Sequence, residues 1–445
     1  MSQKKKYLLW LNGILLAIIL VHSFYRDSQL EKQYPPDLRN RIVGARLQKD
    51  GILPYNYFYD PADGWRYFDP SNHALKSSGC NNVTASPFFH ELLMPFCELP
   101  ERTLSRMWMW MEYLVLVIIA GLAIASTQDN IKRWLIINVA VLFTMTEAWI
   151  VLIERGQLYL FAALLLSLIF FLMTGRRKFA PGFAGLLTVV FILIRPIGLV
   201  LLIPFLPAFR KYRVFLLTTV AALGVYVLFV LSSPWEKSLY SNYFSNMQLQ
   251  VLAHQGLLPP AGRQEFNMFE ADLEGYDYHE VLLERAKHPI VTYSENGNIF
   301  EFYLQATGEY IPLPLLNALF AGSLLILTAA FWYRHRNHPA DTSLTLLFGM
   351  VLYIVTEIFS PVNRHQYYTV EWFPIVLFSI PLLSGHTRMV AWLLFTGLLL
   401  NICNISWIPM RHTLGEFCWV AAILMLTRVK PAAEERYRSP YLPNE

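Results

Sequence analysis

The sequence predicts an all-α integral membrane protein with about twelve transmembrane helices. Apolar and aromatic residues make up 55% of the 445 residues and charged residues 15%, against about 25% charged in soluble proteins. The apolar residues form blocks, such as 7–24, 107–126 and 214–232, and about 18 such residues cross a bilayer. The basic clusters behind the net charge of +4 separate these blocks, where membrane orientation explains them. We therefore expect membrane lipids around the chain and no nucleic-acid partner.

The first block follows Lys4–Lys6, and no small-residue cleavage site follows it, so we interpret it as a retained signal anchor. Further basic clusters recur at every second connection, as expected when both termini are cytoplasmic in a cell (inner) membrane. These clusters are at 132–133, 176–178, 210–213, 334–336, 388 and 428–430. The predicted spans lie near 7–24, 107–126, 134–153, 158–174, 179–194, 197–209, 214–232, 311–333, 341–359, 369–384, 389–408 and 415–428.

The segment 179–209 is predicted to be a short hairpin that turns at Arg195-Pro196. Basic clusters flank both of its ends, so the chain must return to the side from which it started. Each arm reaches only about 20–24 Å, which is less than the hydrocarbon core. An arginine at such a buried turn needs an anionic partner.

Two long segments, about 25–106 and 233–310, are predicted to lie outside the cytoplasm and to carry short helices along the membrane surface. Residues 1–428 then form a single polytopic membrane domain, and 429–445 form a short cytoplasmic tail. Cys80 and Cys97 share the first of these loops, and the spacing leaves both a disulfide and two free thiols open.

Asp37 stands at the external end of the first span, before a predicted helix that ends at Gly51. Arg39, Arg41 and Arg46 lie on this helix, and arginine is a frequent partner of carboxylates and phosphates. The alternative role of Asp37 is to cap the helix, which aspartate commonly does. The two roles are compatible with each other.

Several segments together resemble the polyprenyl-phosphate-dependent membrane glycosyltransferases of the GT-C class, and in particular glycosyltransferase family 87, which is alpha-mannosyltransferase-like. The first is Asp37 followed by Gly44-Ala-Arg46 and by Gly51-x-x-Pro54-Tyr55. The others are Ser86-Pro87 through Pro95 and Leu99-Pro100, Arg155-Gly156-Gln157, Ile194-Arg195-Pro196, and Ser360-Pro361 through Arg364-His365-Gln366-Tyr367-Tyr368. The resemblance extends to about residue 384 and implies a GT-C-like fold.

The resemblance implies an inverting single displacement with Asp37 as the general base. Arg195, Arg364 and His365 would bind the donor phosphate, and cations there would stabilise the growing negative charge. The substrate would also contact Arg39, Arg41, Glu154, Arg155, Gln157, Gln366 and Tyr367. Two residues keep a structural alternative: His365 as a loop histidine bonded to backbone, and Glu154 as a helix-ending partner of Arg155.

The predicted function is transfer of one sugar, for which the resemblance suggests mannose, from a polyprenyl-phosphate donor to a lipid-linked or cell-envelope glycan acceptor outside the cytoplasm. The alternatives are a transporter or flippase of a lipid-linked glycan intermediate and a glycan polymerase or ligase. The histidines are scattered, without His-x-x-x-His spacing, so the sequence predicts no metal site. No cofactor is predicted, and dependence on a divalent cation stays open.

Overall fold

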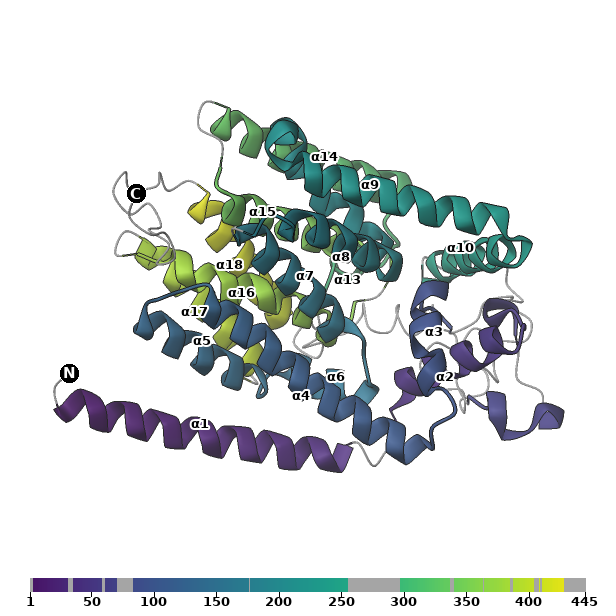
Figure 1. Cartoon of the computed structure of the whole chain (residues 1–445), viewed down its shortest axis with the longest axis horizontal. Helices are drawn as coiled ribbons and strands as arrows, with labels where there is room; N and C mark the ends of the chain where they lie inside the picture. The colour runs from purple at the N-terminus through teal and green to yellow at the C-terminus, as the bar shows by residue number, and fades with distance from the viewer. Residues whose placement is uncertain are drawn as a thin grey trace.

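A computed structural model gives the structure of the chain and describes residues 3–30, 35–57, 61–69, 83–175, 177–254, 297–336, 340–362, 364–384, 387–403, 408 and 410–427. Every regular element in these ranges is a helix, as Figure 1 shows, so the predicted all-α class is confirmed for them. Cys80 and most of the second long loop lie outside the described residues, so the predicted alternatives for Cys80 and Cys97 remain untested.

The first half of the chain forms the elements α1 Gln3–Leu30, α2 Pro36–Lys49, η1 Pro54–Asn56, η2 Pro61–Tyr67, α3 Pro87–Leu93, η4 Met94–Phe96, α4 Glu101–Ala125, α5 Asn130–Phe143, α6 Glu147–Arg155, α7 Tyr159–Thr174, α8 Ala180–Ile194 and η5 Pro196–Ala208. The second half forms α9 Phe209–Ser232, α10 Pro234–His254, α13 Ile299–Thr307, α14 Leu313–His335, α15 Thr342–Ile358, η7 Gln366–Trp372, α16 Phe373–Ser379, η8 Ile380–Leu382, α17 Arg388–Ile402 and α18 Arg411–Leu426. The η elements are 3₁₀ helices.

Four helical segments within the described residues are long and apolar enough to cross a membrane: Tyr7–Leu30, Glu101–Ala125, Pro196–Ser232 and Leu313–His335. A fifth results if α5 and α6 form one span bent by 55°. Large apolar side chains on α1, α9 and α14 are exposed, including Trp10, Val225 and Leu325, as expected for surfaces that face lipid. These features describe a membrane protein, although the count of long spans is smaller than the predicted twelve because several apolar helices are short.

The bundle is built around α15, in which every residue from Leu344 to Ile358 is buried. A helix that is apolar on all sides belongs in the interior, where it can pack on every face. It contacts α7, α16, α18 and η5. Ionisable residues on α15 and on its neighbour η7 are therefore held within the bundle.

Two helix breaks lie where polar groups gather, and only the first of them was predicted from the sequence. The helix α8 ends at Ile194, Arg195 is non-helical, and Pro196 opens η5, which confirms the predicted break at Arg195-Pro196. The predicted span 134–153 is also interrupted, because α5 ends at Phe143 and α6 begins at Glu147. Exposed backbone at such breaks has to be satisfied by protein or by water, so breaks inside spans mark candidate sites.

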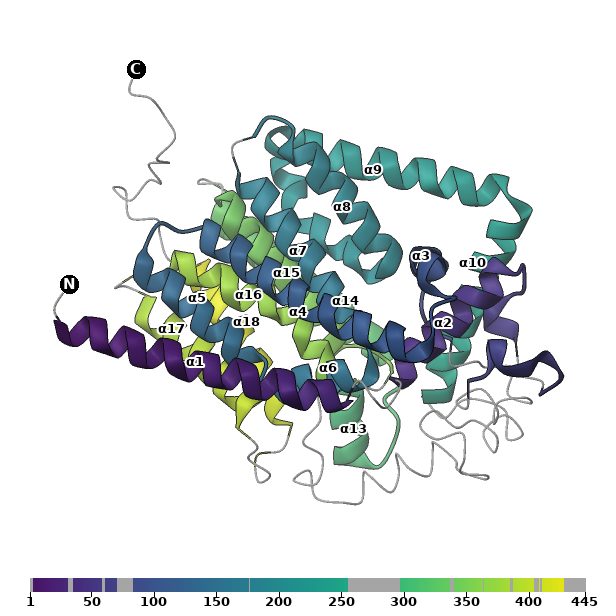
Figure 2. The same ribbon diagram turned by 60° about the horizontal axis from the view of Figure 1, so that its bottom comes forward.

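The helices α2, α3 and α10 lie together at one end of the bundle, opposite the first turns of α1 (Figures 1 and 2). They form a cap that comes from both long predicted loops. The contact between the loops includes Tyr55, whose ring lies 5.3 Å from that of Tyr243. Both loops contain helices as predicted, although α10, with 21 residues, is longer than the short helices that were expected.

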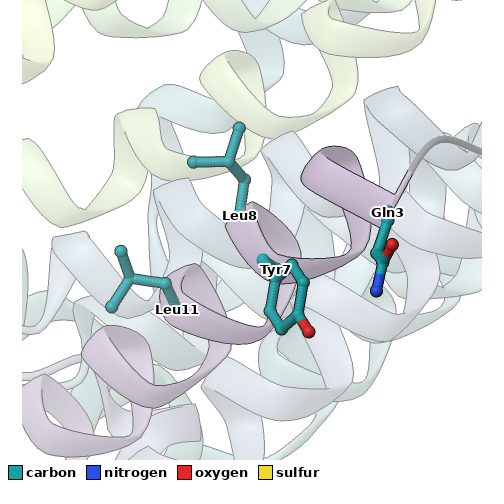
Figure 3. A pocket seen from close by; sticks show the side chains of 4 residues that line it. All are labelled: Gln3, Tyr7, Leu8 and Leu11. Atoms are coloured by element: carbon teal, nitrogen blue, oxygen red, sulfur yellow. The ribbon is translucent and has the colours of Figure 1, made fainter.

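A hollow beside the start of α1 is lined by Gln3, Tyr7, Leu8 and Leu11 (Figure 3). All four residues come from this one helix, and Tyr7 and Leu8 are more than half exposed. The hollow lies at the end of α1 that is remote from α2, so it is separate from the residues predicted to carry chemistry.

The cap contains a pair of glutamates that gives the fold a pH dependence. Burial and the nearby Glu236 of α10 raise the pKa of Glu91 on α3 to about 7, against about 4.3 in an unfolded chain. Because the folded pKa is raised, the stability contributed by protonated Glu91 is present below about pH 4 and is lost as the pH rises through about 7. The hydroxyls of Tyr226 and Tyr240 lie next to this pair, 2.8 Å from each other.

We expect the thermal midpoint of the parent to fall between about pH 5 and pH 8, and Glu91→Gln to reduce this fall. Glu98→Gln is a suitable control, because hydrogen bonds from Arg66 and Lys49 lower the pKa of Glu98 to about 2, so its charge is constant over that window. If the thermal midpoint of Glu91→Gln fell as much as that of the parent, titratable groups other than Glu91 would control the pH dependence of stability.

Candidate functional site

The carboxylate of Asp37 is bound by two side chains that are more than a hundred residues away in sequence. Arg155 donates from Nε to Oδ2 at 2.7 Å and from Nη2 to Oδ1 at 2.9 Å, and Gln157 Nε2 donates to Oδ2. The Asp37 side chain is 22% exposed and that of Arg155 is 34% exposed, so the pair is reachable from outside. The structure thus joins three predicted site residues.

Asp37 does not cap α2 through its side chain. The N-cap position is Pro35, no side-chain hydrogen bond caps the helix, and Asp37 lies in the first turn. Its negative charge there still interacts favourably with the helix dipole. The capping alternative is therefore wrong in its geometry, since the carboxylate points to Arg155 and Gln157.

Gly156 allows this close approach. It ends α6 with φ of 63°, in the left-handed region that favours glycine, and a Cβ there would lie 2.7 Å from Leu38 Cβ and 2.9 Å from Pro35 Cβ. Buried Arg41 of α2 fastens the same turn by donating to Gly156 O at 3.0 Å and to Gln157 Oε1. The helix end at 155–157 and the start of α2 therefore form one unit.

Arg195 lies on the interior side of this unit, among carboxylates and aromatic rings. Its guanidinium pairs with Glu357 of α15 and lies 3.6 Å from Glu371 of η7. It donates to the Tyr353 hydroxyl at 3.1 Å, and that hydroxyl donates to Glu371 at 2.6 Å. The Arg195 side chain remains 19% exposed. The anionic partner that the sequence required for this arginine is therefore supplied by the protein.

Aromatic side chains connect Arg195 to Asp37. Arg195 Cζ lies 4.9 Å from the centroid of the Tyr159 ring and 5.6 Å from that of Tyr368, as in cation–π contacts. The Tyr159 ring stacks on Tyr367 at 5.2 Å, and Asp37 is among the charges that act on Tyr367. These contacts make Asp37, the Tyr159 and Tyr367 rings and Arg195 a continuous cluster.

Arg364 is enclosed more completely than the other predicted phosphate ligands. Its side chain is 1% exposed and donates to both oxygens of Glu416 on α18, while Glu357 lies 3.8 Å away. Thr369 also donates to Glu416 at 2.8 Å. In this structure the Arg364 guanidinium is thus bound by carboxylates of the protein.

The remaining predicted residues divide into two groups. His365 stacks on Tyr367 with centroids 5.1 Å apart, and Gln366 is buried beside it, so these residues accompany the cluster. Arg39 Nε lies 3.4 Å from Asp69 Oδ1, so its ion pair is with Asp69. Glu154 is exposed, and its neighbour Arg155 donates to Asp37, with Glu154 among the nearby charges that act on Arg155.

Sequence reasoning missed the buried carboxylates that surround the arginines, namely Glu357, Glu371 and Glu416. Each lies in or beside an apolar run, and an ionisable residue in such a run is a functional or structural site by default. That signal was available in the sequence. The sequence did not show which arginine each glutamate pairs with, because the pairs join helices that are distant along the chain.

Within the part of the chain that the structure describes, no group of three or more histidine, cysteine, aspartate or glutamate side chains could hold a metal ion. The carboxylates near Arg195 and Arg364 face guanidinium groups instead, which supply the positive charge locally.

The fold and the site describe a helical membrane protein in which a partly exposed aspartate, arginines and tyrosines converge near one end of the bundle. A model of glycosyltransferase family 87 matches residues 84–361, which is more than half of the chain, and the chain belongs to this family. The matched range contains Arg155, Gln157 and Arg195, whereas Asp37 precedes it and Arg364 follows it. No curated protein and no solved structure matches the chain.

Proposed function

We propose that the protein transfers one sugar, with mannose the candidate that the family resemblance suggests, from a polyprenyl-phosphate carrier to a lipid-linked or cell-envelope glycan. Membership of glycosyltransferase family 87 supports the transferase class. The observation that carries the proposal is the Asp37 carboxylate, which is oriented by Arg155 and Gln157 and open on one side.

The hydrogen bonds of Asp37 leave room for an acceptor hydroxyl. A carboxylate has about four lone-pair positions, two on each oxygen. Among the described residues, Oδ2 accepts from Arg155 and Gln157, whereas Oδ1 accepts only from Arg155 Nη2. The second position on Oδ1 is the place for the hydroxyl hydrogen of the acceptor. A base held in this way is pre-oriented for proton transfer.

The reaction is a single displacement with inversion. Asp37 takes the proton of the acceptor hydroxyl while the oxygen forms a bond to the anomeric carbon. The bond from that carbon to the carrier phosphate breaks, and the phosphate leaves with the bonding electrons. The phosphate charge is met by Arg195 and His365, with Arg364 behind them, in an electrostatic role.

The arrangement in the membrane follows from the charge pattern. We place about twelve helices across a cell (inner) membrane, with both termini cytoplasmic and the cap of α2, α3 and α10 outside. The short apolar helices α7, α8, α15 and α17 would then cross as parts of a tilted or locally thinned assembly. In this arrangement Asp37 lies at the external boundary, where a carrier lipid can present its phosphate.

The test is a transfer assay with the purified protein, a lipid extract of the source membranes as acceptor, and labelled sugar on a polyprenyl phosphate or on a nucleotide. We expect label to reach a lipid or glycan only from the polyprenyl-phosphate sugar. The anomeric configuration of the new bond should be opposite to that of the donor. Transfer from the nucleotide sugar alone, or with retained configuration, would contradict the proposal.

A further inference from the structure

A second buried ionic cluster lies where the interrupted span 134–153 restarts as α6. The first residue of α6, Glu147, pairs with Arg411, the first residue of α18. His412 Nε2 lies 3.1 Å from the same Glu147 oxygen, and His412 Nδ1 lies 2.7 Å from Asn401 Oδ1. None of these four residues takes part in the mechanism described above.

Arg411 has hydrogen-bonding capacity that the protein does not use. Its side chain is 2% exposed, and Nε and Nη1, which carry three of the five N–H bonds of a guanidinium, have no hydrogen-bond partner among the described residues. A buried donor without a partner carries a desolvation penalty of about 1–3 kcal/mol, and more when the group is charged. Such a group points to a ligand that supplies the missing acceptor oxygens.

The charges and dipoles around Arg411 favour an anion. Asn401 Nδ2 donates to Gly397 O at 2.9 Å, which fixes its oxygen toward His412, so the two ring nitrogens of His412 face oxygen atoms of Asn401 and Glu147. The N-terminus of the 16-residue helix α18 adds partial positive charge at the same place. Glu147 is the carboxylate bound there, and its side chain is 31% exposed, so the cluster can be reached.

The distance from Asp37 identifies which anion fits. Glu147 and Arg155 are the first and last residues of α6, so the two clusters are about 12 Å apart along this helix. The phosphate that leaves the donor is bonded to the carbon that is attacked, so it must lie next to Asp37. A phosphate at Arg411 therefore belongs to a different molecule, which can reach Asp37 with a short glycan.

We propose that Arg411 and the N-terminus of α18 bind the phosphate diester of a lipid-linked acceptor, whose glycan extends to Asp37. This assignment rests on the proposed function. The element η7 lies along the route, since it packs against both α6 and α18 and carries Tyr367. The site would select acceptors by the separation between their phosphate and the hydroxyl that is glycosylated.

The test measures lipid binding to the purified protein by native mass spectrometry, with phosphatidylglycerol as the phosphodiester probe and diacylglycerol as the probe without phosphate. Polyprenyl phosphate is measured in parallel. We expect Arg411→Gln to weaken the tightest phosphatidylglycerol binding about tenfold or more, because a charged hydrogen bond is lost. Polyprenyl-phosphate binding should be unchanged, and diacylglycerol should bind equally weakly to both proteins.

The matched control is Arg133→Gln, the same substitution at an arginine of α5 that donates to the Thr127 carbonyl at 2.9 Å. It should leave both affinities unchanged. If Arg411→Gln does not fold, a double variant with Arg411→Gln and Glu147→Gln removes the pair without leaving a lone carboxylate. The same loss of phosphatidylglycerol affinity is expected for it.

Two results would overturn the proposal. Equal phosphatidylglycerol affinity in the Arg411 variant and the parent would make Arg411 a structural partner of Glu147. Loss of polyprenyl-phosphate binding alone would assign the site to the donor. Failure of the proposed function itself is recognised separately, as absence of transfer from polyprenyl-phosphate sugar by the parent.

Discussion

Asp37→Asn is expected to lower sugar transfer by about 10²–10⁴-fold, which is the usual contribution of a positioned general base. Asparagine keeps the size of the side chain and an oxygen that can accept from Arg155, but it cannot take the acceptor proton. The pair with Arg155 is partly exposed, so its loss should change the stability little. The measurement is the initial rate of transfer at saturating donor, together with the thermal midpoint and the affinity for polyprenyl phosphate.

Asp50→Asn provides the matched control for this prediction. Asp50 ends the same helix and forms a comparable ion pair with Arg66 at 2.7 Å, but it lies away from the cluster. Its variant should retain the parental rate. A folded Asp37→Asn protein that transfers sugar as fast as the parent would remove Asp37 from the mechanism.

Arg195→Ala is expected to abolish measurable donor binding and to destabilise the protein. Removing this guanidinium leaves Glu357 and Glu371 without their shared cation, and breaking a buried ion pair costs about 3–5 kcal/mol. Arg195→Lys keeps the charge but loses the planar group that lies over Tyr159 and Tyr368. We expect the lysine variant to fold and to bind polyprenyl phosphate about tenfold more weakly than the parent.

The lysine variant separates a role in donor binding from a role in folding. Arg46→Lys is its control, because Arg46 also donates to protein groups, the carbonyls of Cys97 and Arg66, but is not part of the proposed site. Titration with polyprenyl phosphate at equal folded fraction compares the three proteins. Parental affinity in Arg195→Lys, with only a lower thermal midpoint, would assign Arg195 to the fold alone.

The site contains buried carboxylates in addition to the arginines that the sequence indicated. Arg195 and Arg364 together face Glu357, Glu371 and Glu416, so the cluster is not a simple cationic clamp. A donor phosphate has to compete with Glu357 for Arg195. The ion pair with Glu357 keeps the Arg195 guanidinium ordered before the substrate arrives, which is one way in which a site can be preorganised.

The sequence by itself determined the helical class, the positions of the apolar segments and the break at Arg195-Pro196. These features depend on local composition and periodicity and on the backbone restriction of proline. It also indicated Asp37, Arg155 and Gln157, because spans of alternating direction bring their external ends to the same side of a membrane. The motif around Gly156 was informative for a different reason. A glycine is needed where two chain segments approach closely.

Only the tertiary structure decided which charges meet. Asp37 binds Arg155 and not the arginines of its own helix, Arg364 binds Glu416, and Glu147 meets Arg411 across more than 260 residues. Helix packing selects these pairs, and neither the crossing of the helices nor the rotation of each about its axis is encoded in local sequence patterns. The same packing shortened several expected spans. It also left two nitrogens of Arg411 without a partner in the part of the chain that the structure describes, because whether a buried group is satisfied depends on every element that surrounds it.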